Sequence, residues 1–98
     1  MKLNETHIKS QIKDYLAIKN IFNYPVLQGM GAYKGIPDRI LHYRGRVIYL
    51  EVKTQTGKLS PAQEEFCWQC ANDGIDYWVV RSIEDLETHL ELVIKEGE

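Results

Sequence analysis

The residues best suited to catalysis or metal binding are Asp38, Glu51 and Lys53, which lie on two short segments rich in Ile, Leu, Val and Tyr. Arg44 and Gly45 separate the two segments, and a glycine between two β-forming runs is typical of a hairpin turn. If the turn is centred between these two residues, Asp38 faces Glu51 across the hairpin. Directly opposed residues have Cβ atoms about 5 Å apart, where like charges destabilise a sheet. A cation between the two carboxylates would remove that repulsion.

Side chains alternate along a strand, so Lys53 projects to the same face as Glu51, while the carbonyl of Val52 stays near the two carboxylates. Oxygen ligands of this kind suit Mg²⁺ or Mn²⁺, which bind through one or two carboxylates together with water and substrate phosphate. The pattern predicts a divalent metal site formed by Asp38, Glu51 and the carbonyl of Val52. A plainer interpretation stays open, in which Asp38 ends a loop and the other charged side chains are solvated on an edge strand.

This spacing resembles the signature of the PD-(D/E)XK nuclease superfamily, in which an Asp on one strand is followed by Glu-x-Lys on the next. The motif here is Pro37-Asp38, twelve intervening residues, and Glu51-Val52-Lys53. Within the superfamily the sequence is most similar to the virus-type replication-repair nuclease (VRR-NUC) family. The grounds are Gly-Ile-Pro-Asp at residues 35–38 and Gly-Lys-Leu-Ser-Pro-Ala-Gln at residues 57–63, and the resemblance covers nearly the whole chain.

The resemblance implies hydrolysis of DNA phosphodiesters to 5′-phosphate ends, with Lys53 orienting the attacking water or stabilising charge in the transition state. It also implies that Glu5, on the first helix, is a metal ligand directly or through water, and that Gln63 lies beside the metal and orients water or phosphate. Local interpretations of both residues stay open. A first-turn glutamate is favoured by the helix dipole, and Gln63 can complete a capping box with Ser60. The number of metal ions is open too.

The resemblance further suggests a substrate and an assembly. Short stand-alone proteins of this kind are similar to those of bacteriophages, in which dimers are thought to cut branched DNA such as four-way (Holliday) junctions symmetrically. Two sites about a twofold axis would match two scissile bonds. We therefore expect a homodimeric endonuclease in the cytoplasm of a bacterium or a phage-infected cell, with no membrane segment. The alternatives are a single-site nicking, flap or restriction-type nuclease, and a non-catalytic DNA-binding module.

Charge is unevenly distributed along the chain, although the net charge is only −2. Residues 34–58 carry a net +4, with six Lys or Arg against two acids, whereas residues 59–98 carry −8, with two against ten. Positive charge near the motif is what phosphate contacts require. The candidate DNA contacts are Tyr33, which could stack on a base or lean on a sugar, and the cations of Lys34, Arg39 and Lys58. A partly buried tyrosine in a flexible glycine-rich connection, and ordinary solvated cations, are the alternative interpretations.

The length predicts one domain, residues 1–98, and the local patterns predict its elements. An apolar stripe follows Asn4 to about Asn20, a cap and proline start a second helix at Pro61, and Ser82 caps a third. Strands are expected over residues 24–27, in a hairpin within residues 35–53, and over residues 76–80. The resulting fold class is α/β in the order α-β-β-β-α-β-α, a mixed central sheet flanked by helices, as in the core of the PD-(D/E)XK superfamily.

Two other features favour structural roles. Cys67 and Cys70 form a C-x-x-C inside the second helix, where a redox or zinc site is not expected, so we interpret them as small buried side chains. Trp68 and Trp78 are expected in the core or in dimer contacts.

Overall fold

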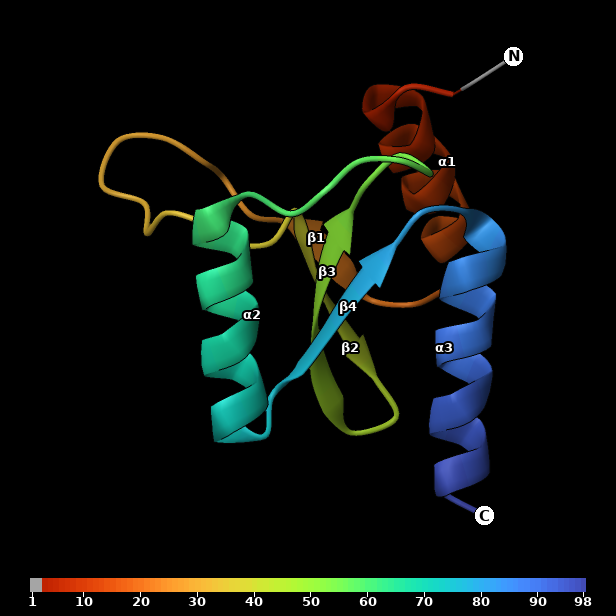
Figure 1. Cartoon of the computed structure of the whole chain (residues 1–98). Helices are drawn as coiled ribbons and strands as arrows, with labels where there is room; N and C mark the ends of the chain where they lie inside the picture. Colours follow the sequence, from red (N-terminus) through yellow and green to blue (C-terminus); the bar gives the residue numbers. More distant parts are fainter. Residues whose placement is uncertain (1–2) are drawn as a thin grey trace.

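The computed structural model describes residues 3–98, which form three helices and one four-stranded sheet (Figure 1). The elements are α1 (Glu5–Ile18), β1 (Asn23–Pro25), β2 (Arg39–Tyr43), β3 (Arg46–Val52), α2 (Pro61–Asp73), β4 (Asp76–Val80) and α3 (Ile83–Glu96). The order in the sheet is β1-β2-β3-β4, with β4 parallel to β3 and the other neighbours antiparallel. The predicted element order and mixed sheet are confirmed. In the part of the chain described, no helix is long and apolar enough to cross a membrane.

The helix boundaries follow local signals in the sequence. The side chain of Asn4 accepts a hydrogen bond from the N–H of His7 at 2.8 Å, which caps α1. Ser60 and Gln63 form the predicted capping box at the start of α2. Gly74 ends α2 in the left-handed conformation, with φ of 68°, which a glycine adopts without steric penalty. These caps satisfy backbone groups that the ends of a helix otherwise leave unpaired.

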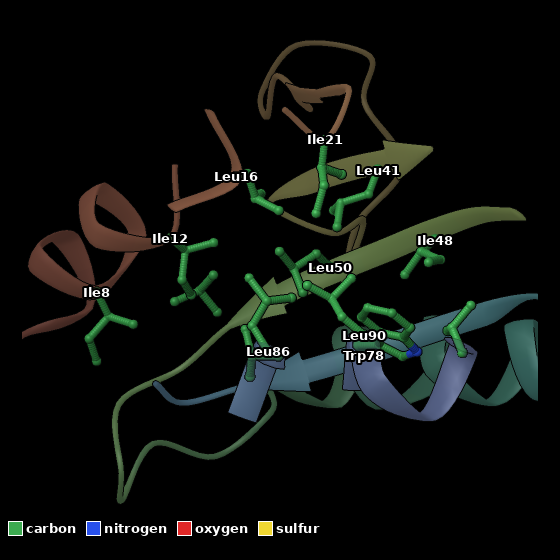
Figure 2. Packing of buried hydrophobic residues seen from close by; sticks show 13 residues of the cluster. Ile8, Ile12, Leu16, Ile21, Leu41, Ile48, Leu50, Trp78, Leu86 and Leu90 are labelled. Carbon is green, nitrogen blue, oxygen red and sulfur yellow. The ribbon is translucent and has the colours of Figure 1, made fainter. Parts of the chain in front are cut away.

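The larger core lies between one face of the sheet and the pair α1 and α3 (Figure 2). Of the predicted stripe on α1, Ile8, Ile12 and Leu16 are buried there, and Tyr15 is half-buried against the same cluster. From the sheet and α3, the same cluster contains Leu41, Ile48, Leu50, Val52, Trp78, Val80, Leu86, Leu90 and Val93. Burial of this aliphatic surface supplies most of the driving force for folding, and it holds α1 against β3.

The other face of the sheet is covered by α2, and its packing is aromatic. The ring of Phe66 lies 5.6 Å from that of Tyr49 and 5.9 Å from that of Tyr77, measured between centroids. Figure 1 shows α2 alone on this side, away from α1 and α3. The sheet is therefore a middle layer with a closed aliphatic face and a more open aromatic face.

The two tryptophans differ in burial, and so do the two cysteines. Trp78 is buried in the core as expected, but Trp68 is 58 % exposed, so a place in the core of this chain is wrong for it. Cys70 is buried, whereas Cys67 is only half-buried, and both thiols are free. Trp68 lies on the outer surface of α2 because that helix covers the sheet with a single narrow face, centred on Phe66 and Cys70.

Candidate active site

The hairpin of β2 and β3 has the predicted register as far as the pair of Arg39 and Leu50. Asp38 lies outside this ladder, so its prediction as a direct ladder partner of Glu51 is wrong. The N–H of Asp38 donates to the carbonyl of Leu50 at 3.0 Å, so that two successive residues oppose one, which is the pattern of a β-bulge. Bulges redirect side chains, and the carboxylate of Asp38 here accepts a hydrogen bond from the N–H of Val52 at 2.7 Å.

The backbone of Val52 presents its carbonyl at the same place. The N–H and C=O groups of one strand residue face the same neighbouring strand, and the N–H of Val52 points to Asp38. On the other side of the strand, the N–H of Lys53 donates to the carbonyl of Val80 at 3.0 Å. The backbone of β3 is therefore held from β4 at this point, while the N–H and carbonyl of Val52 face the segment that carries Asp38.

Glu51 is a buried carboxylate, 2 % exposed. Its Oε2 accepts a hydrogen bond from Nε2 of Gln63 at 3.1 Å and lies 4.0 Å from Nζ of Lys53. Its Oε1 is buried without a hydrogen-bond partner among residues 3–98. Burial, followed by the nearby carboxylate of Asp38, raises the pKa of Glu51 to about 8. Two adjacent carboxylates, one with an unpaired buried oxygen, and the neighbouring carbonyl of Val52 form a donor set that a hard divalent cation fits.

Gln63 completes the predicted capping box and also contacts the buried carboxylate, while its expected role in orienting water or phosphate stays a prediction. Its Oε1 accepts a hydrogen bond from the N–H of Ser60 at 2.9 Å, which completes the capping box. Its Nε2 binds Glu51, so the first turn of α2 is joined directly to the buried carboxylate. One side chain thus caps the helix and orients Glu51.

Glu5 is linked to the site by ion pairs with Lys53 and Lys9. Nζ of Lys53, a side chain only 13 % exposed, lies 3.9 Å from Oε1 of Glu5. Oε2 of Glu5 is 3.3 Å from Nζ of Lys9. Within residues 3–98 no group of three or more His, Cys, Asp or Glu side chains is placed to hold a metal ion. Ligation of the ion by Glu5 accordingly stays a prediction.

Lys9 is a site residue that the sequence reasoning missed. Its Nζ lies 3.0 Å from Oδ1 of Asp38, as well as beside Glu5. Burial lowers the pKa of Lys9, but the hydrogen bonds and charges of the two carboxylates outweigh it and leave the pKa raised. The only signal in the sequence was the four-residue spacing from Glu5, which many exposed helices share.

A second missed residue is Tyr77, on β4. Its hydroxyl is buried without a hydrogen-bond partner in the described part of the chain. Burial, followed by the charge of Glu51, raises the pKa of Tyr77. The tyrosine therefore borders the buried carboxylate as a neutral phenol, and its strand pattern alone predicted only a packed aromatic.

Of the predicted DNA contacts, three side chains are exposed and one is hydrogen-bonded within the protein. Tyr33, 65 % exposed, and the exposed Lys34 line a groove of about 510 Å³ between their loop and the start of α2. Lys58 is exposed on the connection from β3 to α2. Arg39 is half-buried, and its Nε donates to Oδ1 of Asn23 at 2.9 Å, so it is engaged within the sheet.

The loop before β2 is fixed against α2 by Gly35. Its φ is 87°, and a Cβ placed on it would lie 2.2 Å from the carbonyl oxygen of Ala62. Only a residue without a side chain permits this approach. The contact holds residues 35–38, which end in Asp38, against the helical turn that carries Gln63.

This arrangement defines a class of protein. An Asp at the start of one strand, Glu-x-Lys on the next, and a helix running back beside them on a mixed sheet are the features of a PD-(D/E)XK nuclease. The sequence profile of the VRR-NUC domain matches residues 5–84. The chain belongs to the VRR-NUC family, a family of nucleases that act on DNA.

Solved structures agree on the fold. A VRR_NUC domain protein superposes with a TM-score of 0.77 at 19 % identity, with 97 % of this chain and 91 % of that chain covered. A second structure, a VRR_NUC domain, superposes with a TM-score of 0.74 at 22 % identity, covering 89 % of this chain and 94 % of that chain. No curated protein matches the sequence significantly. At these identities the likeness supports the fold.

Proposed function

We propose that this chain is a divalent-metal-dependent endodeoxyribonuclease that cuts branched DNA such as Holliday junctions as a homodimer, with residues 1–98 acting as one nuclease domain. Its place of action would be the cytoplasm of a bacterium or a phage-infected cell. The observation that carries the proposal is the buried Glu51, which keeps one oxygen unpaired beside the carboxylate of Asp38. Burying a carboxylate beside a second one costs free energy, and a divalent cation bound between the two would offset that cost.

The metal ligands would be Asp38, Glu51 and the carbonyl of Val52, with Glu5 as a further ligand, directly or through water. Mg²⁺ or Mn²⁺ bound there would polarise the scissile phosphate and lower the pKa of a bound water. Glu51 and Val52 lie on β3, and Asp38 directly precedes β2 and is hydrogen-bonded to the N–H of Val52, so the sheet would position the three ligands together.

The remaining roles belong to the chain's own side chains. Lys53 is confined between Glu51 and Glu5, so its ammonium is held where it can orient the attacking water or stabilise charge on the phosphate. Gln63 has its carbonyl oxygen engaged in the capping box, so we assign its amide the orientation of Glu51 and, through it, of the metal and its water. Tyr33, Lys34 and Lys58 would contact the DNA backbone on either side, and Arg39 would act closer to the sheet.

An exposed aromatic cluster supports the homodimer. Phe22 is 62 % exposed and Tyr24 is 41 % exposed, and the ring of Phe22 lies 4.8 Å from that of His42. These residues lie on and beside the edge strand β1 and on β2, and contiguous exposed apolar groups mark association surfaces. A twofold dimer would present two sites to a junction with two scissile bonds.

The test is cleavage of a labelled four-way junction, a flap and a linear duplex with Mg²⁺ or Mn²⁺. We expect paired symmetric cuts in the junction by the wild type and a loss of at least about 100-fold in rate for Lys53→Ala. Lys58→Ala is the matched control, because it removes one exposed positive charge and should weaken binding without abolishing chemistry. Circular dichroism of both variants checks that the fold is intact.

Each alternative outcome has a definite meaning. Cleavage of duplex or flap alone keeps the nuclease and discards the junction-resolving activity. A monomer in light scattering at micromolar concentration removes the dimer. Absence of any metal-dependent cleavage overturns the enzymatic proposal in favour of a DNA-binding module.

A further inference from the structure

The side chain of Lys9 makes two ion pairs, and its position on α1 explains only one of them. Its spacing from Glu5 on α1 accounts for one ion pair, at 3.3 Å. The other pair, at 3.0 Å to Oδ1 of Asp38, joins α1 to the start of β2, far away in the sequence. The ammonium therefore lies directly against a carboxylate proposed as a metal ligand.

The hydrogen bonds of Asp38 show which oxygen remains for an ion. Oδ2 accepts the N–H of Val52 at 2.7 Å, a contact that the backbone of β3 holds in place. Oδ1 is the other oxygen, and Nζ of Lys9 is its ionic partner. A divalent ion and an ammonium that approach the same oxygen repel each other, so binding of one opposes binding of the other.

Lys9 is free to leave this place, in contrast with the second lysine of the site. Its side chain is 42 % exposed, whereas that of Lys53 is 13 % exposed and confined between two glutamates. The long flexible stem of a lysine allows Nζ to swing into solvent when the pair is broken. A displaced ammonium beside the scissile position would face the negatively charged backbone of bound DNA.

We propose that Lys9 is an internal counter-ion that holds Asp38 in the metal-free protein, competes with the divalent ion for Oδ1, and after displacement binds a DNA phosphate. This inference rests on the proposed metal site, and it couples binding of the metal ion to binding of DNA. The metal displaces a cation that then becomes available to the substrate.

The first test is calorimetric titration of the metal-free protein with Mn²⁺. We expect Lys9→Gln to bind the ion about three- to tenfold more tightly than the wild type, because a competing charge is gone. Lys9→Arg keeps the charge and should stay near the wild type. Lys13→Gln is the matched control, since Lys13 is exposed one turn further along α1 and the same charge is removed away from the site.

The outcomes separate this inference from the proposed function. Wild-type binding with unchanged or weaker binding by Lys9→Gln overturns the inference and leaves the metal site standing. Tighter binding by Lys13→Gln as well would reduce the effect to net charge and overturn it too. Failure of both the wild type and Lys9→Gln to bind Mn²⁺ removes the metal site, and the inference with it.

The phosphate contact is tested by DNA binding with Ca²⁺ as the divalent ion. We expect Lys9→Gln to weaken binding about threefold or more and to lower the slope of log affinity against log salt by about one, with Lys9→Arg restoring both. An unchanged salt dependence in Lys9→Gln would contradict the phosphate contact.

Discussion

The two faces of β3 have different chemical surroundings: one packs in the hydrophobic core, and the other carries the charged residues of the candidate site. Ile48, Leu50 and Val52 point to α1 and α3 and are completely buried. The alternate residues face the side of α2, where Val47 is 52 % exposed and Glu51 is buried beside polar and charged groups. A strand has a side-chain period of two, so stability and chemistry are separated within one segment of seven residues. The face of a residue, more than its distance from the site, should decide what its substitution affects.

The largest stability effect is expected on the closed face. Leu50→Ala should lower the free energy of unfolding by about 3 kcal/mol, because it removes a fully buried side chain and leaves a cavity. Val47→Ala on the other face of the same strand should cost less than about 1 kcal/mol. Urea unfolding of both variants measures the difference, and equal losses would contradict the distinction between the faces.

The next effect is expected where the loop before Asp38 meets α2. Gly35→Ala should destabilise the protein by about 2 kcal/mol or more and reduce cleavage, because the added Cβ meets the carbonyl of Ala62 and pushes the loop away from the site. Gly31→Ala is the control, since Gly31 also has a positive φ, of 79°, but a Cβ there meets nothing within 4 Å. It should show only the backbone strain, about 1 kcal/mol. Thermal unfolding that ranks the two variants equally would show that the contact with Ala62 is unimportant.

The smallest of these effects is expected in the pH dependence of stability. The pKa of Glu51 is raised from 4.5 to about 8 in the folded protein, so the folded state favours its protonated form. The associated stability is fully present below pH 4.5 and is lost as the pH rises through 8. In EDTA, the free energy of unfolding of the wild type should therefore fall between pH 5 and 9 by more than that of Glu51→Gln, with a difference on the order of 1–2 kcal/mol that thermal melting measures.

Added Mn²⁺ gives the control for this pH effect. It should recover the stability of the wild type at high pH, because it neutralises the buried carboxylates, and should leave Glu51→Gln less affected. If the stability of the two proteins changes with pH in the same way from pH 5 to 9, the pKa of Glu51 is not raised in the folded state.

Much of the fold was predictable because its signals are local. The caps at Asn4, Ser60 and Ser82, the turn at Arg44 and Gly45, and the buried alternation in β3 each depend on a few neighbouring residues. The same locality predicted the register of the hairpin, which the turn sets. It failed at Asp38, where a bulge that no turn residue announces redirects the side chain.

The elements, the burial pattern of the strands and the Asp and Glu-x-Lys motif could be read from the amino-acid sequence alone, because they follow from spacing along the chain. Lys9 pairs with Asp38, the amide of Gln63 binds Glu51 and Gly35 lies against the start of α2, and these three contacts are visible in the folded chain alone. Each of these contacts joins segments that the packing of α1 and α2 on opposite faces of the sheet brings together. The spacing of residues along one segment carries no measure of that packing, so the environment of the site emerges only in the folded chain.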